Sequence, residues 1–167
     1  MNRRQINEEE LQALFAAIGK GIWYLQYVED VLHNYITLKR DVKVRGTVSP
    51  EKAEAILLKN RSKTLGKSLQ IASDAQVLSP SLQKRLNKFK DERDWLVHRS
   101  VYQNGDDLYL EVKRVALINR IQIFSDEALL LQKLIAKEME DFVVPQRVSR
   151  EQIMHMANEN MRKLKGE

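Results

Sequence analysis

The segment from Arg93 to His98 holds the residue types best suited to chemistry in this sequence. A helix over this region places its apolar side chains on one stripe, and Arg93 stands where that stripe expects an apolar residue. The apolar members of the stripe are Leu82, Leu86, Phe89, Leu96 and Val97. A buried guanidinium is costly unless it is paired. Arg93 is therefore expected to reach the surface, to pair with a core carboxylate, or to bind an anion at a face that meets a partner.

Asp94 and His98 are four residues apart and would share one face of the same helix. A contact between them would orient the imidazole or favour its protonated form. The alternative is a surface ion pair that contributes little to stability. A second Arg and His pair at the same spacing, Arg150 and His155, lies in a different apolar context near the C-terminus, and we interpret it as accidental.

The elements that would position these residues are predicted to be helices. Apolar residues at helical spacing, preceded by a capping box of Asn7 and Glu10, predict a first helix within the first 40 residues. Two Ser-Pro pairs, at 49–50 and 79–80, each predict the start of a further helix. A short helix is expected over about 62–76.

The pattern after residue 100 is less regular. Residues 103–107 predict a turn, and alternating apolar residues in 108–124 favour short strands. Ser125 is predicted to start a helix that ends before Pro145, and a final helix is expected over 150–164. The predicted fold is all-α, an up-and-down helical bundle with a short extended excursion. Its helical domain spans 1–144, and a C-terminal helical arm spans 145–167.

Composition limits the classes of function. The chain has 167 residues, no Cys and a net charge of +5. The lack of Cys excludes disulfides, zinc–thiolate sites and thiol catalysis. No spacing typical of a metal site is visible, so neither a metal nor another cofactor is expected. There is no apolar signal segment and no apolar run of membrane-spanning length, and we interpret the protein as cytoplasmic.

Residues 82–102, which contain Arg93, Asp94 and His98, resemble the signature helix of the HEPN superfamily. In its ribonucleases an Arg is followed, four to six residues later, by a His, and a polar residue commonly follows the Arg. Asp94 stands at that polar position. Residues 18–29 resemble the first helix of small bacterial members, and Thr64-Leu65-Gly66 matches a short element between the two.

The resemblance implies a metal-independent endoribonuclease that acts as a symmetric homodimer, with two Arg and His pairs around one cleft. Arg93 would clamp a phosphate, and His98 would act as general base or acid on the ribose 2′-OH or the leaving oxygen. Attack by the 2′-OH restricts the substrate to RNA and leaves a cyclic phosphate. Bacterial toxins of this family are often held in check by an antitoxin protein, so a toxin or a stress or defence effector is implied.

Three further residues are candidates for substrate binding. Lys90 and Arg99 would add phosphate contacts, and Tyr102 would position a base or a phosphate. The alternative interpretation is that Lys90 and Arg99 are solvated charges and that Tyr102 is a partly buried aromatic residue. Two other functions stay open for the whole chain. One is a non-catalytic HEPN module that binds nucleotide or RNA, or only dimerises. The other is an unrelated helical adaptor in which Arg93 makes a structural pair.

Overall fold

The computed structural model describes residues 3–146, 154–155, 158–159 and 162. These residues are helical apart from their connecting turns, and no strand occurs among them. The predicted all-α fold class is therefore confirmed. Most of the predicted final helix over 150–164, including Arg150 of the second Arg and His pair, lies outside the described residues.

Helix α1 (Glu8–Ile36) begins with the predicted capping box. The Glu10 amide donates to Asn7 Oδ1 at 2.8 Å, and the Asn7 amide donates to Glu10 Oε2 at 3.1 Å. The helix continues into a π-helical segment, Thr37–Val42, and ends where Lys43 adopts a φ of 61°. Each half of this capping box satisfies an amide that the first helical turn leaves free.

Helices α2 (Pro50–Arg61), α3 (Leu65–Asp74) and α4 (Pro80–Asp94) begin in the same way. The hydroxyls of Ser49, Thr64 and Ser79 each accept a hydrogen bond from a backbone amide of the first turn. Proline follows the first and the last of these caps, at a position where no amide hydrogen is needed. The starts predicted from the Ser-Pro pairs, and the short helix between them, are confirmed.

The extended excursion predicted over 108–124 is wrong. After α4 the chain forms a π turn (Trp95–Arg99), the short helix α5 (Ser100–Asn104) and a 3₁₀ turn (Gly105–Tyr109). The turn predicted at 103–107 thus occurs two residues later, as this 3₁₀ turn. Helix α6 (Glu111–Val143) then runs without a break, and a 3₁₀ turn (Val144–Gln146) follows it.

Helix α6 buries residues at helical spacing, which explains why the alternation was misleading. Its buried apolar members are Leu117, Ile121, Phe124, Ala128, Leu131 and Ile135. The alternation arises because exposed apolar residues also occur in this stretch: Val112 precedes the first buried apolar residue, and Ile123 lies between Ile121 and Phe124. The helix start predicted at Ser125 is also wrong, because that side chain is buried within the helix and its hydroxyl donates to the Ile121 carbonyl.

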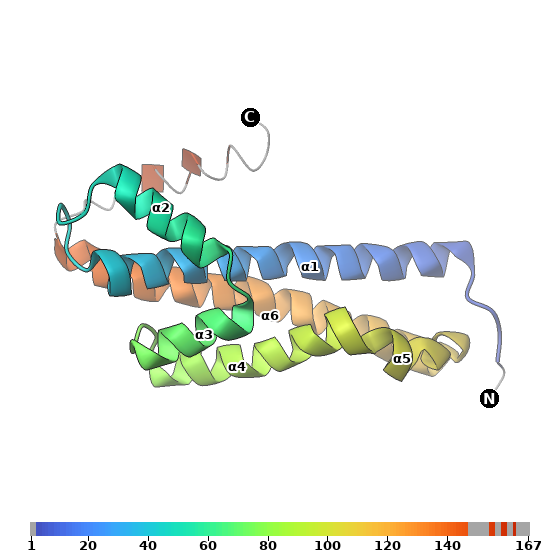
Figure 1. Ribbon diagram of the computed structural model, residues 1–167. Helices are drawn as coiled ribbons and strands as arrows, with labels where there is room; N and C mark the ends of the chain where they lie inside the picture. Colours follow the sequence, from blue (N-terminus) through green and yellow to red (C-terminus); the bar gives the residue numbers. More distant parts are fainter. Residues whose placement is uncertain (1–2, 147–153, 156–157, 160–161, 163–167) are drawn as a thin grey trace.

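Helices α1 and α6 lie side by side and run in the same direction, whereas α4 runs against both (Figure 1). At one end Arg114 of α6 contacts Glu10 of α1, and at the other Phe142 contacts Tyr35. Gly21 lets the two long helices approach closely, because a Cβ there would lie 3.3 Å from Phe124.

Helix α4 lies against this pair and closes the core, in which Phe89 of α4 stacks on Phe124 with ring centroids 4.6 Å apart. Helices α2 and α3 lie between α1 and α4 in the sequence, and α3 packs against both of them. No helix in the described part of the chain is long and apolar enough to cross a membrane.

Candidate functional site

The π turn at the end of α4 brings Arg93 and His98 together. An α-helix would place two residues that are five apart about 140° from each other around its axis. In the π turn the Ser100 amide donates to the Trp95 carbonyl, five residues earlier, so residues at this spacing come into register. Arg93 Nη1 consequently lies 3.3 Å from His98 Nε2, and the imidazole is exposed.

Two contacts of Trp95 hold the π turn against the bundle. Its buried indole donates to Asn104 Oδ1 at 3.0 Å, and the guanidinium of Arg120 lies over its ring at 3.6 Å. The next residue, Leu96, is also buried. The wider turn thus places Trp95 and Leu96 in the core while it presents His98 to solvent.

The hydrogen-bond donors of Arg93 are only partly satisfied within the fold. Its Nη1 donates to Asp94 Oδ1 at 3.0 Å, and 23% of its side chain is exposed. Its Nε is buried and has no hydrogen-bond partner among the described residues. A buried donor without a partner is costly, so the fold holds Arg93 with its hydrogen-bonding capacity only partly satisfied, and a ligand can reach only the exposed part of its side chain.

Asp94 contacts cations and not the imidazole that the sequence assigned to it. Its carboxylate accepts from Arg93 and, at 3.2 Å, from Lys90, and no hydrogen bond to His98 occurs in the described structure. Burial raises the pKa of Asp94, but hydrogen bonds from Arg93 and Lys90 outweigh burial and leave that pKa below its usual value. Asp94 is therefore an anion that orients Arg93.

Glu29 of α1 faces Arg93 and was not predicted as a site residue. Burial raises the pKa of Glu29 and the charge of Arg93 opposes this effect without cancelling it. No apolar gap in α1 marks Glu29, because Leu25, Val28 and Leu32 are all buried and keep the apolar stripe beside it complete.

The three predicted substrate-binding residues surround this pair but differ in how free they are. Lys90 contacts Asp91 at 3.1 Å as well as Asp94, and these hydrogen bonds raise its pKa. Arg99 donates to the Asp91 carbonyl at 3.1 Å. Tyr102 is 71% exposed, so the interpretation of a partly buried aromatic residue is wrong. Tyr102 has the most accessible side chain of the three.

Apolar side chains are exposed beside His98. Val97 was predicted on the buried stripe, yet it is exposed, as are Val101 and Tyr102. The π turn is the physical reason, because it adds a residue to the turn and rotates the positions that follow. This apolar patch, Val97, Val101 and Tyr102, adjoins the Arg93–His98 pair and is suited to contact with a partner.

Among the residues that the structure describes, no group of three or more His, Cys, Asp or Glu side chains is arranged to hold a metal ion. Comparison of the chain with protein-family models, with curated proteins and with solved structures found no match.

Proposed function

We propose that this protein is a metal-independent endoribonuclease of the HEPN type. The observation that carries the proposal is the 3.3 Å approach of Arg93 Nη1 to an exposed His98 Nε2, created by the π turn. An Arg beside a His offers a phosphate ligand and a proton-transfer group at one point.

The reaction follows from these two side chains. His98 takes the proton from a ribose 2′-OH, whose oxygen forms a bond to the adjacent phosphorus while the bond from phosphorus to the 5′ oxygen breaks. The leaving 5′ oxygen takes up a proton from an imidazolium, and the products are a 2′,3′-cyclic phosphate and a 5′-hydroxyl. Arg93 stabilises the negative charge that grows on the phosphoryl oxygens, and Asp94 fixes the orientation of Arg93.

A second copy of the chain would supply the second imidazole. The apolar patch of Val97, Val101 and Tyr102 lies next to His98, so a two-fold contact through it would place two Arg93–His98 pairs around one cleft. One histidine then acts as the base and its symmetry mate as the acid. We place this activity in the cytoplasm, in a toxin or a stress or defence effector that an antitoxin restrains.

Cleavage of a labelled mixed RNA pool in EDTA tests the proposal. The wild type should leave cyclic phosphate ends, and Arg93→Ala and His98→Ala should each reduce the cleavage rate about 100-fold or more. Arg61→Ala and His155→Ala are matched controls, because both side chains are exposed and Arg61 forms its ion pair with Asp30 of α1. Circular dichroism establishes that all variants are folded.

The proposal fails if the folded wild type leaves the pool intact, or if both site variants cut as fast as the controls. The exposed apolar patch favours one second candidate, a non-catalytic module that dimerises through this face. In that case light scattering would report a dimer that Val101→Asp dissociates, and no RNA would be cut.

A further inference from the structure

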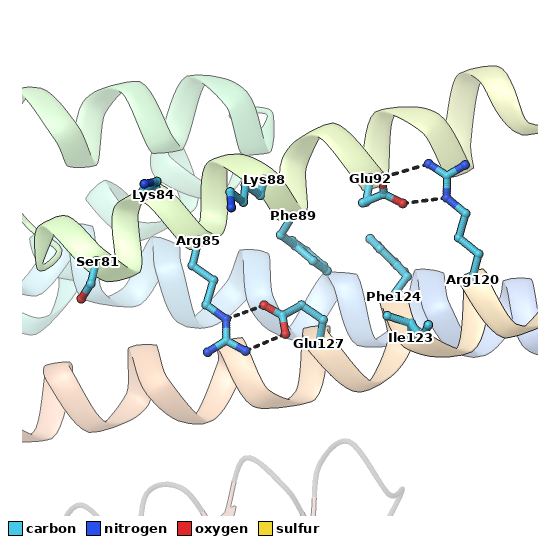
Figure 2. Close-up of a pocket in the computed structure, with 10 residues that line it drawn as sticks. All are labelled: Ser81, Lys84, Arg85, Lys88, Phe89, Glu92, Arg120, Ile123, Phe124 and Glu127. Atoms are coloured by element: carbon cyan, nitrogen blue, oxygen red, sulfur yellow. Dashed lines mark hydrogen bonds and ion pairs between the residues drawn. The ribbon is translucent and has the colours of Figure 1, made fainter.

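A groove of about 570 Å³ lies between α4 and α6 (Figure 2). On α4 it extends from Ser81 to Glu92, a distance of about 16 Å along the helix axis. None of its lining residues belongs to the Arg93–His98 site. Arg93 lies about 40° around α4 from Phe89 and about 100° from Glu92, because it is four residues from the first and one from the second. The candidate site thus borders the Glu92 end of the groove without sharing a residue with it.

The floor of the groove is apolar. Ile123 is 68% exposed on its α6 side, and the edges of Phe89 and Phe124 lie between the helices. These two rings stack on each other with an interplanar angle of 6°, so their faces are already covered. A nucleic-acid base would need such a face for stacking, whereas an aliphatic side chain packs well against ring edges and Ile123.

The walls carry an excess of positive charge. Both groove carboxylates form ion pairs with arginines (Figure 2). Arg85 donates two hydrogen bonds to Glu127, at 2.6 and 2.8 Å, and Arg120 donates two to Glu92, each at 2.9 Å. These bidentate pairs are internally neutral.

The two remaining cations of the groove are Lys84 and Lys88 of α4. Both are exposed, and neither makes an ion pair or a hydrogen bond with another described residue. They stand one helical turn apart, so they present a short row of positive charge along one wall of an apolar groove. A partner that matched this row would carry carboxylates along one edge.

The geometry points to the α4–α6 groove as a docking site for an acidic amphipathic helix of a protein partner. The groove has the length of about three helical turns, and a helix laid lengthwise would rest over the two ion pairs that cross it from α4 to α6. Aliphatic side chains of that helix pack on the exposed Ile123, and its Glu or Asp side chains pair with Lys84 and Lys88. Because the groove is separate from the Arg93–His98 pair, docking requires no catalytic activity.

Fluorescence anisotropy with the full chain tests this inference. The probe is a labelled peptide of about 15 residues that has Leu at positions spaced by three and four residues and Glu on its flanks. A scrambled peptide of equal composition and a version with Lys in place of Glu are the peptide controls. We expect the acidic amphipathic peptide to bind at least about tenfold more tightly than either control, with an affinity that falls as salt rises.

The double variant Lys84→Glu/Lys88→Glu should weaken this binding about tenfold or more, and Ile123→Asp should weaken it similarly. The matched control is Lys52→Glu/Lys133→Glu, which changes the net charge equally at two exposed positions outside the groove and should leave the affinity within about twofold. Arg93→Ala should also leave peptide binding unchanged, which keeps this test independent of the proposed ribonuclease activity.

Equal binding of the three peptides, or equal loss in the two double variants, would overturn the inference. So would a result in which Lys84→Glu/Lys88→Glu abolishes binding of a single-stranded RNA oligonucleotide while the acidic peptide shows no affinity for the wild type. That last outcome would assign the lysine row to nucleic acid.

Discussion

Two arginines face a glutamate of α1 in this molecule, and their surroundings differ. Arg114 is 3% exposed; its Nη2 donates to Glu10 Oε1 at 2.7 Å and its Nη1 donates to the Leu108 carbonyl at 2.9 Å. Hydrogen bonds from Arg4 and from the Asn7 amide hold the pKa of Glu10 at about 2, and the charge of Arg114 contributes. At this end of the bundle Arg114 and Glu10 are therefore both held by direct hydrogen bonds.

At the other pair, Arg93 and Glu29 form no direct ion pair with each other in the described structure, and Arg93 pairs with the neighbouring Asp94 instead. Burial raises the pKa of Glu29 despite the nearby guanidinium, and Arg93 keeps a buried Nε without a partner among the described residues. Each arginine makes two side-chain hydrogen bonds, so the number of bonds does not separate the two cases. Arg114 is almost fully buried and bonds through two nitrogens, whereas Arg93 is 23% exposed, bonds through Nη1 alone and keeps a buried Nε without a partner among the described residues.

The largest expected difference between the pairs is in stability. Arg114→Ala should lower the free energy of unfolding by about 2–3 kcal/mol, because it leaves a cavity and removes the donor of the Leu108 carbonyl. Arg93→Ala should lower it by less than about 1 kcal/mol, because Arg93 is more exposed than Arg114 and its removal also removes a buried donor that has no partner among the described residues. Urea denaturation followed by circular dichroism measures both. Equal losses would remove the distinction between a structural and a ligand-binding arginine.

A smaller effect concerns the pH dependence at Glu10. Its folded-state pKa of about 2 lies below the ordinary value of 4.5, so ionised Glu10 stabilises the fold at pH values above 4.5, and this contribution is lost as pH falls through about 2. Glu10→Gln retains a capping side chain. The wild type should therefore be more stable than this variant near pH 7, and the difference should shrink below pH 4.5. A difference that is constant between pH 7 and pH 3 would contradict the assignment.

The smallest effect has the opposite sign and concerns Glu29. Because burial raises the folded-state pKa of Glu29, this side chain ionises at a lower pH in the unfolded chain than in the folded chain. The free energy of unfolding of the wild type therefore falls as pH rises from the ordinary value of 4.5 to the folded-state pKa. Glu29→Gln removes this titration. Relative to the wild type, the variant should gain stability between acidic and neutral pH in the same urea experiment. A relative loss over that interval would show that Arg93 and Glu29 form a stabilising pair after all.

Local signals in the sequence predicted most helix starts correctly. The caps Asn7, Ser49 and Ser79 act within one turn of the chain, so their types and spacing are sufficient to identify them. The error over 108–124 has a different origin. Exposed Val112 and Ile123 add apolar positions to α6, and periodicity alone does not reveal which apolar residues are buried.

The candidate site was only partly predictable. Residue types indicated Arg93 and His98, but an α-helical register places them on different sides and pairs His98 with Asp94 instead. The π turn instead brings His98 to Arg93, and Trp95 in that turn packs against Asn104 and Arg120. Asn104 lies in the segment that follows and Arg120 lies further along the chain, so local sequence does not reveal these contacts. Periodicity could not have identified Glu29, because buried Val28 keeps the apolar stripe of α1 complete next to it.

The same π turn lowers the stability of the monomer because it leaves apolar side chains exposed to solvent. By adding one residue to the turn, it directs Val97 and Val101 toward solvent instead of the core. Full burial of a valine side chain would contribute about 1.5 kcal/mol or more. The isolated subunit forgoes part of that free energy at the very turn that pairs Arg93 with His98, so a contact that covers these valines would recover it and stabilise the paired geometry.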